Sequence, residues 1–314
     1  MTRPLIAAVQ LPEAAARSWL DGVENLDLRV TGADLSALDA DVECLVLAPE
    51  SHGGKLIAPP QWPGAVRWVQ LLSTGTDGYP QWVFEGVTVS TMHGVNAAAV
   101  AEFALAAILS AARRIPEIWA ESASWESRQG TDLADAIIGI VGFGAIGEAI
   151  ASRAAAFGMH VQAIRASDAP MPAYVRRASS IGDLFASSDH VVLALPSSAA
   201  TARLVDAALL DKAKDGLHLV NVARGDLVDE SALLAALDRG KIALATLDVL
   251  AQEPPPHDHP LLQHPRARVS SHLAANTPGA IQGIARRIRK NIEAFRGGAP
   301  LEGLLKPDAR QKAA

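Results

Sequence analysis

The sequence predicts an α/β fold made of two doubly wound parallel-sheet domains. Short apolar runs alternate with alanine-rich, helix-forming stretches along almost the whole chain, which is the pattern of βαβ units. The chain has 314 residues, of which 49% are hydrophobic, so it can bury two cores of ordinary size. One long helical stretch separates two series of apolar runs, and this break indicates two domains rather than one.

The first series of apolar runs predicts five strands, each bounded by helix-permissive or Gly/Pro-rich segments. These strands are expected at residues 5–11, 26–30, 43–48, 66–72 and 87–91. The long helical stretch follows at 96–125. Its apolar residues recur all around the helix rather than on one stripe, which predicts burial between layers or between subunits.

The second series predicts six more strands with helices between them. They are expected at residues 137–142, 161–165, 190–195, 217–222, 243–249 and 267–272. A final helical stretch at 278–298 has only a short polar segment after it. We expect this last helix to return to the first domain.

Charge and cysteine content exclude several classes of function. The formal net charge is -6 and no run of lysine or arginine occurs, so we expect neither nucleic acid nor an anionic membrane as a partner. Cys44 is the only cysteine, which excludes an internal disulfide and leaves a buried packing role. The first residues fit neither a secretory signal nor a membrane span, so we expect a cytoplasmic protein. As a separate expectation, the protein uses no metal.

A glycine motif opens the second series. Gly142, Gly144 and Gly147 have G-x-G-x-x-G spacing between an apolar strand and a helix, which is the context that makes this motif specific for dinucleotides. We expect a tight turn at Gly142, close approach of a pyrophosphate at Gly144 and close helix-to-strand packing at Gly147. The helix that begins at Ala145 and Ile146 would face the phosphates with its N-terminus.

Arg165 ends the next predicted strand, about 20 residues after the motif, where an acidic residue normally binds the ribose hydroxyls of NAD. A guanidinium cannot accept hydrogen bonds from hydroxyls, but it pairs with a 2'-phosphate, and Ser167 could add a donor. These residues favour NADP over NAD. The alternative is that Arg165 faces solvent and Asp168 binds the ribose.

Three polar residues follow later strands of the second series: Arg224, Glu253 and His272. Strand ends of a doubly wound sheet converge on the cofactor crevice. Arginine can orient a carboxylate and polarise a carbonyl, while histidine can exchange a proton and a neighbouring carboxylate favours its imidazolium form. Singly, each could be a surface residue or half of an ion pair. Together they predict reduction of a 2-keto acid, with Gly225 leaving room beside Arg224 for cofactor and substrate.

With these motifs the sequence resembles the D-isomer-specific 2-hydroxyacid dehydrogenase family, which includes glyoxylate/hydroxypyruvate reductases and phosphoglycerate dehydrogenases. The resemblance covers nearly the whole chain, and it rests on seven ordered motifs: 73–78, 100–115, 139–147, 188–206, 221–237, 247–254 and 270–278. It implies a flavodoxin-like substrate domain formed by 1–95 plus 281–314, a Rossmann NAD(P)-binding domain at 96–280, and a substrate in the cleft between them. It also implies a homodimer through the helix that begins near Asn96.

The resemblance further assigns roles to matching positions. Arg224 resembles the substrate-binding arginine, Glu253 the acid that pairs with histidine, and His272 the acid/base. The loop at Thr74 and Gly75 resembles the one whose backbone N–H groups hold the substrate carboxylate. The implied cofactor contacts are Gly142, Gly144, Ala145, Ile146, Gly147, Arg165, Ser167, Pro196, Val222 and Asp248.

Related activities on the same scaffold remain alternatives. Formate dehydrogenases carry glutamine in place of the acid, so Glu253 argues against formate. Phosphite dehydrogenase-like enzymes use one more arginine, and we interpret Arg286, Arg287 and Arg289 as a solvated helix face rather than a second anion clamp. A dinucleotide-sensing, corepressor-like binding protein could retain a similar triad. The leading hypothesis is reversible reduction of glyoxylate or hydroxypyruvate to the D-2-hydroxy acid.

Overall fold

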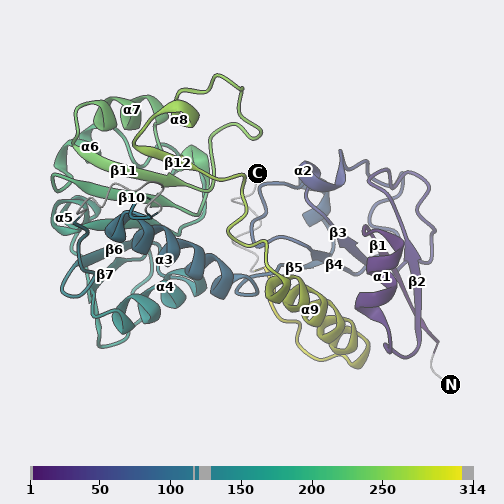
Figure 1. Ribbon diagram of the computed structural model, residues 1–314. Helices are drawn as coiled ribbons and strands as arrows, with labels where there is room; N and C mark the ends of the chain where they lie inside the picture. The colour runs from purple at the N-terminus through teal and green to yellow at the C-terminus, as the bar shows by residue number, and fades with distance from the viewer. Residues whose placement is uncertain (1–2, 116, 120–128, 306–314) are drawn as a thin grey trace. The chain divides into compact units, whose positions relative to one another are not determined.

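A computed structural model describes residues 3–115, 117–119 and 129–305. The chain divides into two compact units: residues 1–96 with 277–314, and residues 97–276 (Figure 1). The sequence places these boundaries after residues 95 and 280. Position 280 lies within the first turn of the last helix, which begins at Pro278 and belongs entirely to the first unit.

The first unit is built around a five-stranded sheet in the order β2-β1-β3-β4-β5, and all its strand pairs are parallel. This order is the flavodoxin-like one, as the sequence predicts. The elements of this unit are β1 (Leu5–Val9), α1 (Glu13–Leu20), β2 (Leu26–Val30), β3 (Cys44–Leu47), α2 (Glu50–Gly53), β4 (Trp68–Leu71), the 3-10 helix η1 (Gln81–Phe84), β5 (Thr88–Ser90) and α9 (Pro278–Gly297).

Helix α9 packs on this sheet although almost 190 residues separate it from β5 in the chain. Ile288 and Ile292 are fully buried in one core with Trp68, and the Asn291 side chain donates to Gln70 Oε1 at 2.8 Å. The last helix therefore lies in the first compact unit. Cys44 is buried in the same core, and burial raises the pKa of its thiol.

The second unit contains a seven-stranded parallel sheet in the order β12-β11-β10-β9-β6-β7-β8. Its elements are α3 (Ala97–Arg113), β6 (Ile137–Val141), α4 (Ala145–Ala156), β7 (His160–Ile164), β8 (Val175–Arg177), α5 (Ile181–Ser187), β9 (His190–Leu193), α6 (Ala207–Lys212), β10 (Leu217–Asn221), the 3-10 helix η2 (Gly225–Leu227), α7 (Glu230–Asp238), β11 (Ile242–Leu247), α8 (Pro260–Gln263) and β12 (Ala267–Val269). All six strands predicted for this region occur. The edge strand β8 is an addition.

Helices cover both faces of this sheet, because alternate residues of each buried strand point to opposite sides. Ile138 and Ile140 of β6 pack with α3 and α4, whereas Val141 packs in the core formed with α5, α6 and α7 (Figure 1). From β6 the chain runs to β7 and β8 on one side and to β9 on the other. The carboxyl ends of β6 and β9 therefore flank the switch point where doubly wound sheets bind ligands.

Helix α3 is shorter than the sequence predicts. It ends at Arg113, whereas the helical stretch was expected to extend to residue 125; residues 116 and 120–125 lie outside the described residues. Arg114 has φ +54°, in the left-handed region, and the next residue precedes a proline, which disfavours helical backbone. Among the described helices, none combines the length and the apolar character needed to cross a membrane.

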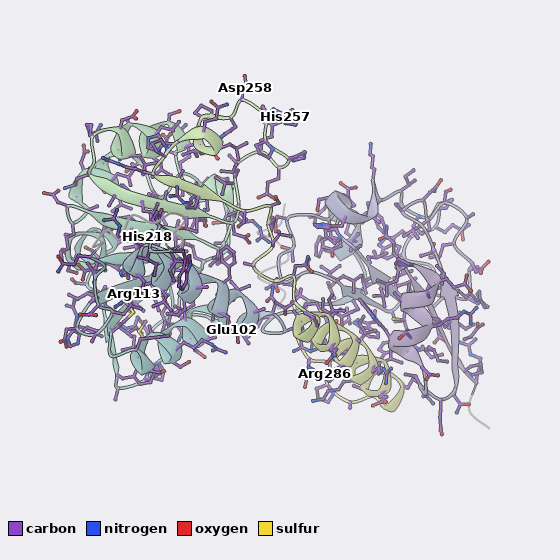
Figure 2. All side chains as sticks on the ribbon, in the orientation of Figure 1. Glu102, Arg113, His218, His257, Asp258 and Arg286 are labelled. Atoms are coloured by element: carbon purple, nitrogen blue, oxygen red, sulfur yellow. The ribbon has the colours of Figure 1, made fainter. Side chains whose placement is uncertain are left out.

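Two histidines face each other inside the second unit. His190 Nδ1 lies 3.3 Å from His218 Nδ1, and His218 Nε2 lies 2.9 Å from Thr246 Oγ1 (Figure 2 labels His218). Burial lowers the pKa of His190 to about 4, against a smaller opposing effect of Asp189. Burial also lowers the pKa of His218 to about 3. Both rings are therefore neutral near pH 7, and the two facing nitrogens share one proton.

This pair predicts a loss of stability on mild acidification. The unfolded chain takes up protons at these rings near pH 6.5 and the folded chain does not, so the free energy of unfolding falls as pH drops from about 6.5 toward 4. The slope is at most about 1.4 kcal/mol per pH unit for each proton. A His218→Gln variant should flatten this slope in thermal unfolding, whereas His160→Gln, at an exposed site, should leave it unchanged. An equal slope in wild type and His218→Gln would contradict the assignment.

Candidate functional site

The residues singled out in the second unit follow consecutive neighbouring strands of one parallel sheet. In the order of the strands across the sheet, His272 follows β12, Asp248 follows β11, Arg224 follows β10, Pro196 follows β9 and Gly142 follows β6. Arg165 comes next, after β7. Because parallel strands end at the same edge, the fold brings these positions into one row across the switch point.

The glycine turn has the geometry that the motif predicts. Gly142 has φ +98°, and a Cβ there would lie 2.5 Å from the Ala194 carbonyl oxygen. A Cβ at Gly147 would lie 2.3 Å from the Gly142 carbonyl oxygen, so helix α4 can pack this closely only with glycine. At Gly144, in contrast, nothing lies within 4 Å of a Cβ position. The first and third glycines are thus required by contacts within the chain, and the second faces open space.

This turn fits the pyrophosphate of a dinucleotide. Gly144 is the N-cap residue of α4, and no side chain caps this helix end. Among the described residues, none accepts from the backbone N–H groups of Ala145 or Ile146, which point from the first turn of the helix. Unsatisfied N–H groups at a helix N-terminus beside open space suit a bound phosphate.

Arg165 lies next to this turn. Its guanidinium carbon is 6.0 Å from the centre of the Phe143 ring, and the residue is half-buried. Arg177 donates to the carbonyl oxygens of Ser167 and Ala169, so a second arginine holds the loop after β7. Asp168 is exposed on the same loop. The loop after β7 therefore carries one cationic group, Arg165, near the glycine turn.

His272 and Glu253 form a hydrogen-bonded pair. His272 Nδ1 lies 2.8 Å from Glu253 Oε2, and both side chains are about two-fifths exposed. The backbone N–H of Leu250 donates to the other oxygen, Glu253 Oε1, at 3.1 Å. Because Glu253 engages Nδ1, the imidazole has Nε2 left for exchange with a reacting molecule.

Asp248 holds the turn that carries His272. Its buried carboxylate accepts from the hydroxyl of Ser270 at 2.6 Å and from the backbone N–H groups of Leu273 and Ala274 at 2.8 and 3.0 Å. The N–H of His272 also donates to the Asp248 carbonyl oxygen at 2.8 Å. His272 has φ +56°, a conformation that a non-glycine residue keeps only when its surroundings fix it. The sequence assigns Asp248 to the cofactor and misses this structural role.

Arg224 is half-buried at the N-cap of η2. Its guanidinium donates to the Ala223 carbonyl oxygen at 2.7 Å, and the Asn221 side chain donates to the Arg224 carbonyl oxygen at 2.8 Å. The expectation that Gly225 leaves room for cofactor and substrate is wrong. A Cβ at Gly225 would lie 1.9 Å from the Leu250 carbonyl carbon, so the missing side chain makes room for the backbone that leads to Glu253.

The loop with Thr74 and Gly75 belongs to the first unit, after β4. The Thr74 hydroxyl lies 3.3 Å from the Met92 carbonyl oxygen, and the Ser73 hydroxyl donates to the Gly75 carbonyl oxygen at 2.6 Å. These bonds hold the loop in a defined conformation. Within the described part of the chain, no group accepts from the backbone N–H groups of Thr74 or Gly75, which remain available to an anion.

In residues 3–115, 117–119 and 129–305, no group of three or more His, Cys, Asp or Glu side chains is arranged to hold a metal ion.

Comparison with known proteins identifies related chains. Residues 105–274 match the family model described as "D-isomer specific 2-hydroxyacid dehydrogenase, NAD binding domain". The chain is 34% identical to a D-3-phosphoglycerate dehydrogenase of Mycobacterium leprae over 312 residues, which cover 93% of this chain and 54% of that protein. It is 36% identical to a glyoxylate reductase of Thermococcus kodakarensis over 226 residues, which cover 68% of each.

A solved structure extends this likeness to the whole fold. The crystal structure of a glyoxylate reductase from Paecilomyes thermophila superimposes with a TM-score of 0.81 at 26% identity, covering 98% of this chain and 99% of that one. The chain spans about half the length of most of the curated relatives that it matches.

Proposed function

The chain belongs to the D-isomer specific 2-hydroxyacid dehydrogenase family, and on this premise we propose that it catalyses the reversible reduction of a small 2-keto acid to the D-2-hydroxy acid. The observation that carries the proposal is the hydrogen bond between His272 Nδ1 and Glu253, on the sheet edge that also holds Arg224 and the glycine turn. This arrangement provides a proton donor, an anion-binding group and a dinucleotide site.

The proposed proton transfer uses His272 Nε2. The glycine turn at Gly142 and Gly144 would hold a nicotinamide cofactor, which when bound would supply the hydride that C2 of the keto acid takes up. His272, with Nδ1 held by Glu253, donates a proton from Nε2 to the carbonyl oxygen as negative charge develops there. Glu253 accepts from Nδ1 and so fixes the ring orientation. In the oxidation direction, the neutral Nε2 accepts the proton of the hydroxyl group.

We assign the substrate carboxylate to Arg224 and to the backbone N–H groups of Thr74 and Gly75. A guanidinium forms charge-assisted hydrogen bonds with a carboxylate, and the loop N–H groups have no acceptor among the described residues. Fixing the carboxylate in this way orients C2 of the acid for hydride transfer.

Glyoxylate and hydroxypyruvate are the substrates that we propose. The likeness to a glyoxylate reductase over 68% of both chains supports this class. Arg287 and Arg289 bind carbonyl oxygens of the first unit, and Arg287 also pairs with Glu302 at 3.0 Å. Because these two guanidinium groups already bind partners within the chain, they are poorly placed to form a second anion-binding site for a doubly charged substrate such as phosphite.

The role of His272 can be tested directly. His272→Asn should lower kcat by about a hundredfold or more, because asparagine cannot exchange a proton at the position of Nε2. Steady-state oxidation of the reduced cofactor at saturating keto acid measures kcat, and fluorescence titration checks that cofactor affinity is retained. A kcat near that of the wild type would remove His272 from this role.

We propose that the protein prefers NADP, through Arg165 and Ser167. The kcat/KM for glyoxylate or hydroxypyruvate should be at least about tenfold higher with NADPH than with NADH, a difference of about 1.4 kcal/mol. Arg165→Ala should remove this preference and leave kcat/KM with NADH nearly unchanged, because only the 2'-phosphate contact is lost. A wild-type preference for NADH would contradict the assignment. Tight cofactor binding without turnover of any 2-keto acid would favour a dinucleotide sensor instead.

We propose a homodimer that uses the surface at the end of α3. Ile115, Ile118 and Trp119 are exposed there, and Trp119 retains 62% of its accessible area. An exposed cluster of large apolar side chains is typical of an interaction surface. Sedimentation equilibrium should give twice the monomer mass, and Trp119→Ser should shift the protein toward monomer. A wild-type monomer at micromolar concentration would contradict this proposal.

A further inference from the structure

Glu253 lies in a loop whose two ends are hydrogen-bonded to a second carboxylate, that of Glu230. This loop, residues 250–259, connects the end of β11 to α8 and carries Glu253 close to its start. Figure 2 shows His257 and Asp258 at its outer end, pointing away from the protein body. Without contacts at its base, such a loop would place Glu253 imprecisely.

Glu230, the first residue of α7, contacts both ends of this loop. Glu230 Oε1 accepts from the backbone N–H of Ala251 at 2.9 Å, and Glu230 Oε2 lies 3.2 Å from His259 Nε2. The side chains of Glu230 and His259 are 21% and 14% exposed, so water competes little for these bonds. One carboxylate thereby closes the loop at residues 251 and 259.

The tautomer of His259 supports this interpretation. His259 Nδ1 is buried and has no hydrogen-bond partner among the described groups. A neutral ring with its proton on Nδ1 would bury an unpaired donor, which is costly. The proton of the neutral ring therefore resides on Nε2, where it is donated to Glu230. Glu230 therefore accepts two hydrogen bonds, one at Oε1 from the Ala251 N–H and one at Oε2 from His259 Nε2.

The segment that leads to Glu230 also contacts the loop. Because Gly225 has no Cβ, the backbone of Leu250 and Ala251 can occupy the position where that atom would lie. Arg224 is the residue directly before Gly225. Leu250, in turn, donates its N–H to Glu253 Oε1 at 3.1 Å. A continuous set of contacts thus runs from Glu230 through Ala251 and Leu250 to Glu253.

We propose that Glu230, with His259, is a positioning residue that holds Glu253 in place against His272. It touches neither substrate nor cofactor and acts through the backbone of the loop. Only the expected effect of Glu230 on turnover rests on the proposed function. Its structural part, the hydrogen bond between Glu253 and His272, can be measured without any substrate.

The chain offers a matched control at the other end of α7. Asp238 Oδ1 lies 3.2 Å from His264 Nε2, which is again a carboxylate–imidazole pair between α7 and the α8 region. Among the described residues, the Asp238 side chain bonds to His264 and to no residue of the loop 250–259. Asp238→Ala therefore removes a carboxylate–imidazole contact of the same length, at a carboxylate that is 72% exposed, without releasing Glu253.

The test compares Glu230→Ala, Glu230→Gln and Asp238→Ala in the full chain. Amide hydrogen exchange at residues 250–253, followed by mass spectrometry, should accelerate at least about tenfold in Glu230→Ala, because local opening exposes amides that were hydrogen-bonded. The Nδ1 proton resonance of His272, identified by its loss in His272→Asn, should weaken or disappear in the same variant. Asp238→Ala should match the wild type in both measurements.

Turnover gives the second readout. Glu230→Ala should lower kcat about tenfold with little change in KM, because a displaced Glu253 no longer orients His272. Glu230→Gln should lie between wild type and Glu230→Ala, since an amide has one acceptor oxygen and cannot serve both Ala251 and His259. Circular dichroism checks that each variant is folded.

The outcomes separate this inference from the proposed function. If Glu230→Ala equals Asp238→Ala in exchange and in the His272 resonance, the inference is overturned, whatever the turnover. If the wild type turns over no 2-keto acid but the exchange and resonance differ as expected, the proposed function fails and the positioning role of Glu230 stands.

Discussion

All seven strands of the second unit run parallel, and the candidate site depends on this constraint. A parallel sheet places the carboxyl ends of all its strands at one edge. Site residues as far apart in the chain as Gly142 and His272 therefore lie in the same row, each after its strand. The glycine turn follows β6, which neighbours β9 at the switch point of the strand order. The order of the strands therefore decides which residues can act together, and each loop needs to place only one or two side chains.

Carboxylates inside the chain convert this coarse placement into a defined geometry. Asp248 accepts from three donors of the turn that carries His272, and Glu253 accepts from His272 and from the backbone of its own loop. Backbone N–H groups that point to one carboxylate fix a turn more firmly than a single bond, because opening it leaves several polar groups unpaired. These contacts hold His272 at positive φ and leave its Nε2 directed away from Glu253.

Much of the fold could be predicted from local patterns. The apolar runs identified eleven of the twelve strands in the described part of the chain, because most of these strands are buried, and the glycine spacing identified the turn at Gly142. Strand β8 was missed because Val175 is followed by two arginines, so the segment contains no apolar run. The end of α3 was misplaced because the left-handed turn at Arg114 has no glycine to mark it, and because the expected helix was extended through Pro116, which disfavours helical backbone at the residue before it.

By itself, the sequence determined the two βαβ series, the glycine turn and the polar residues that follow each strand, since these depend on local spacing and on the period of buried side chains. Only the tertiary structure decided how those residues are held. The sequence predicts that Gly225 leaves space for a ligand, whereas it accommodates the backbone of Leu250, and the contact of Glu230 with Ala251 appears only in the folded chain. Such roles arise from contacts between segments some twenty or more residues apart, and no local pattern encodes which backbone will approach which side chain.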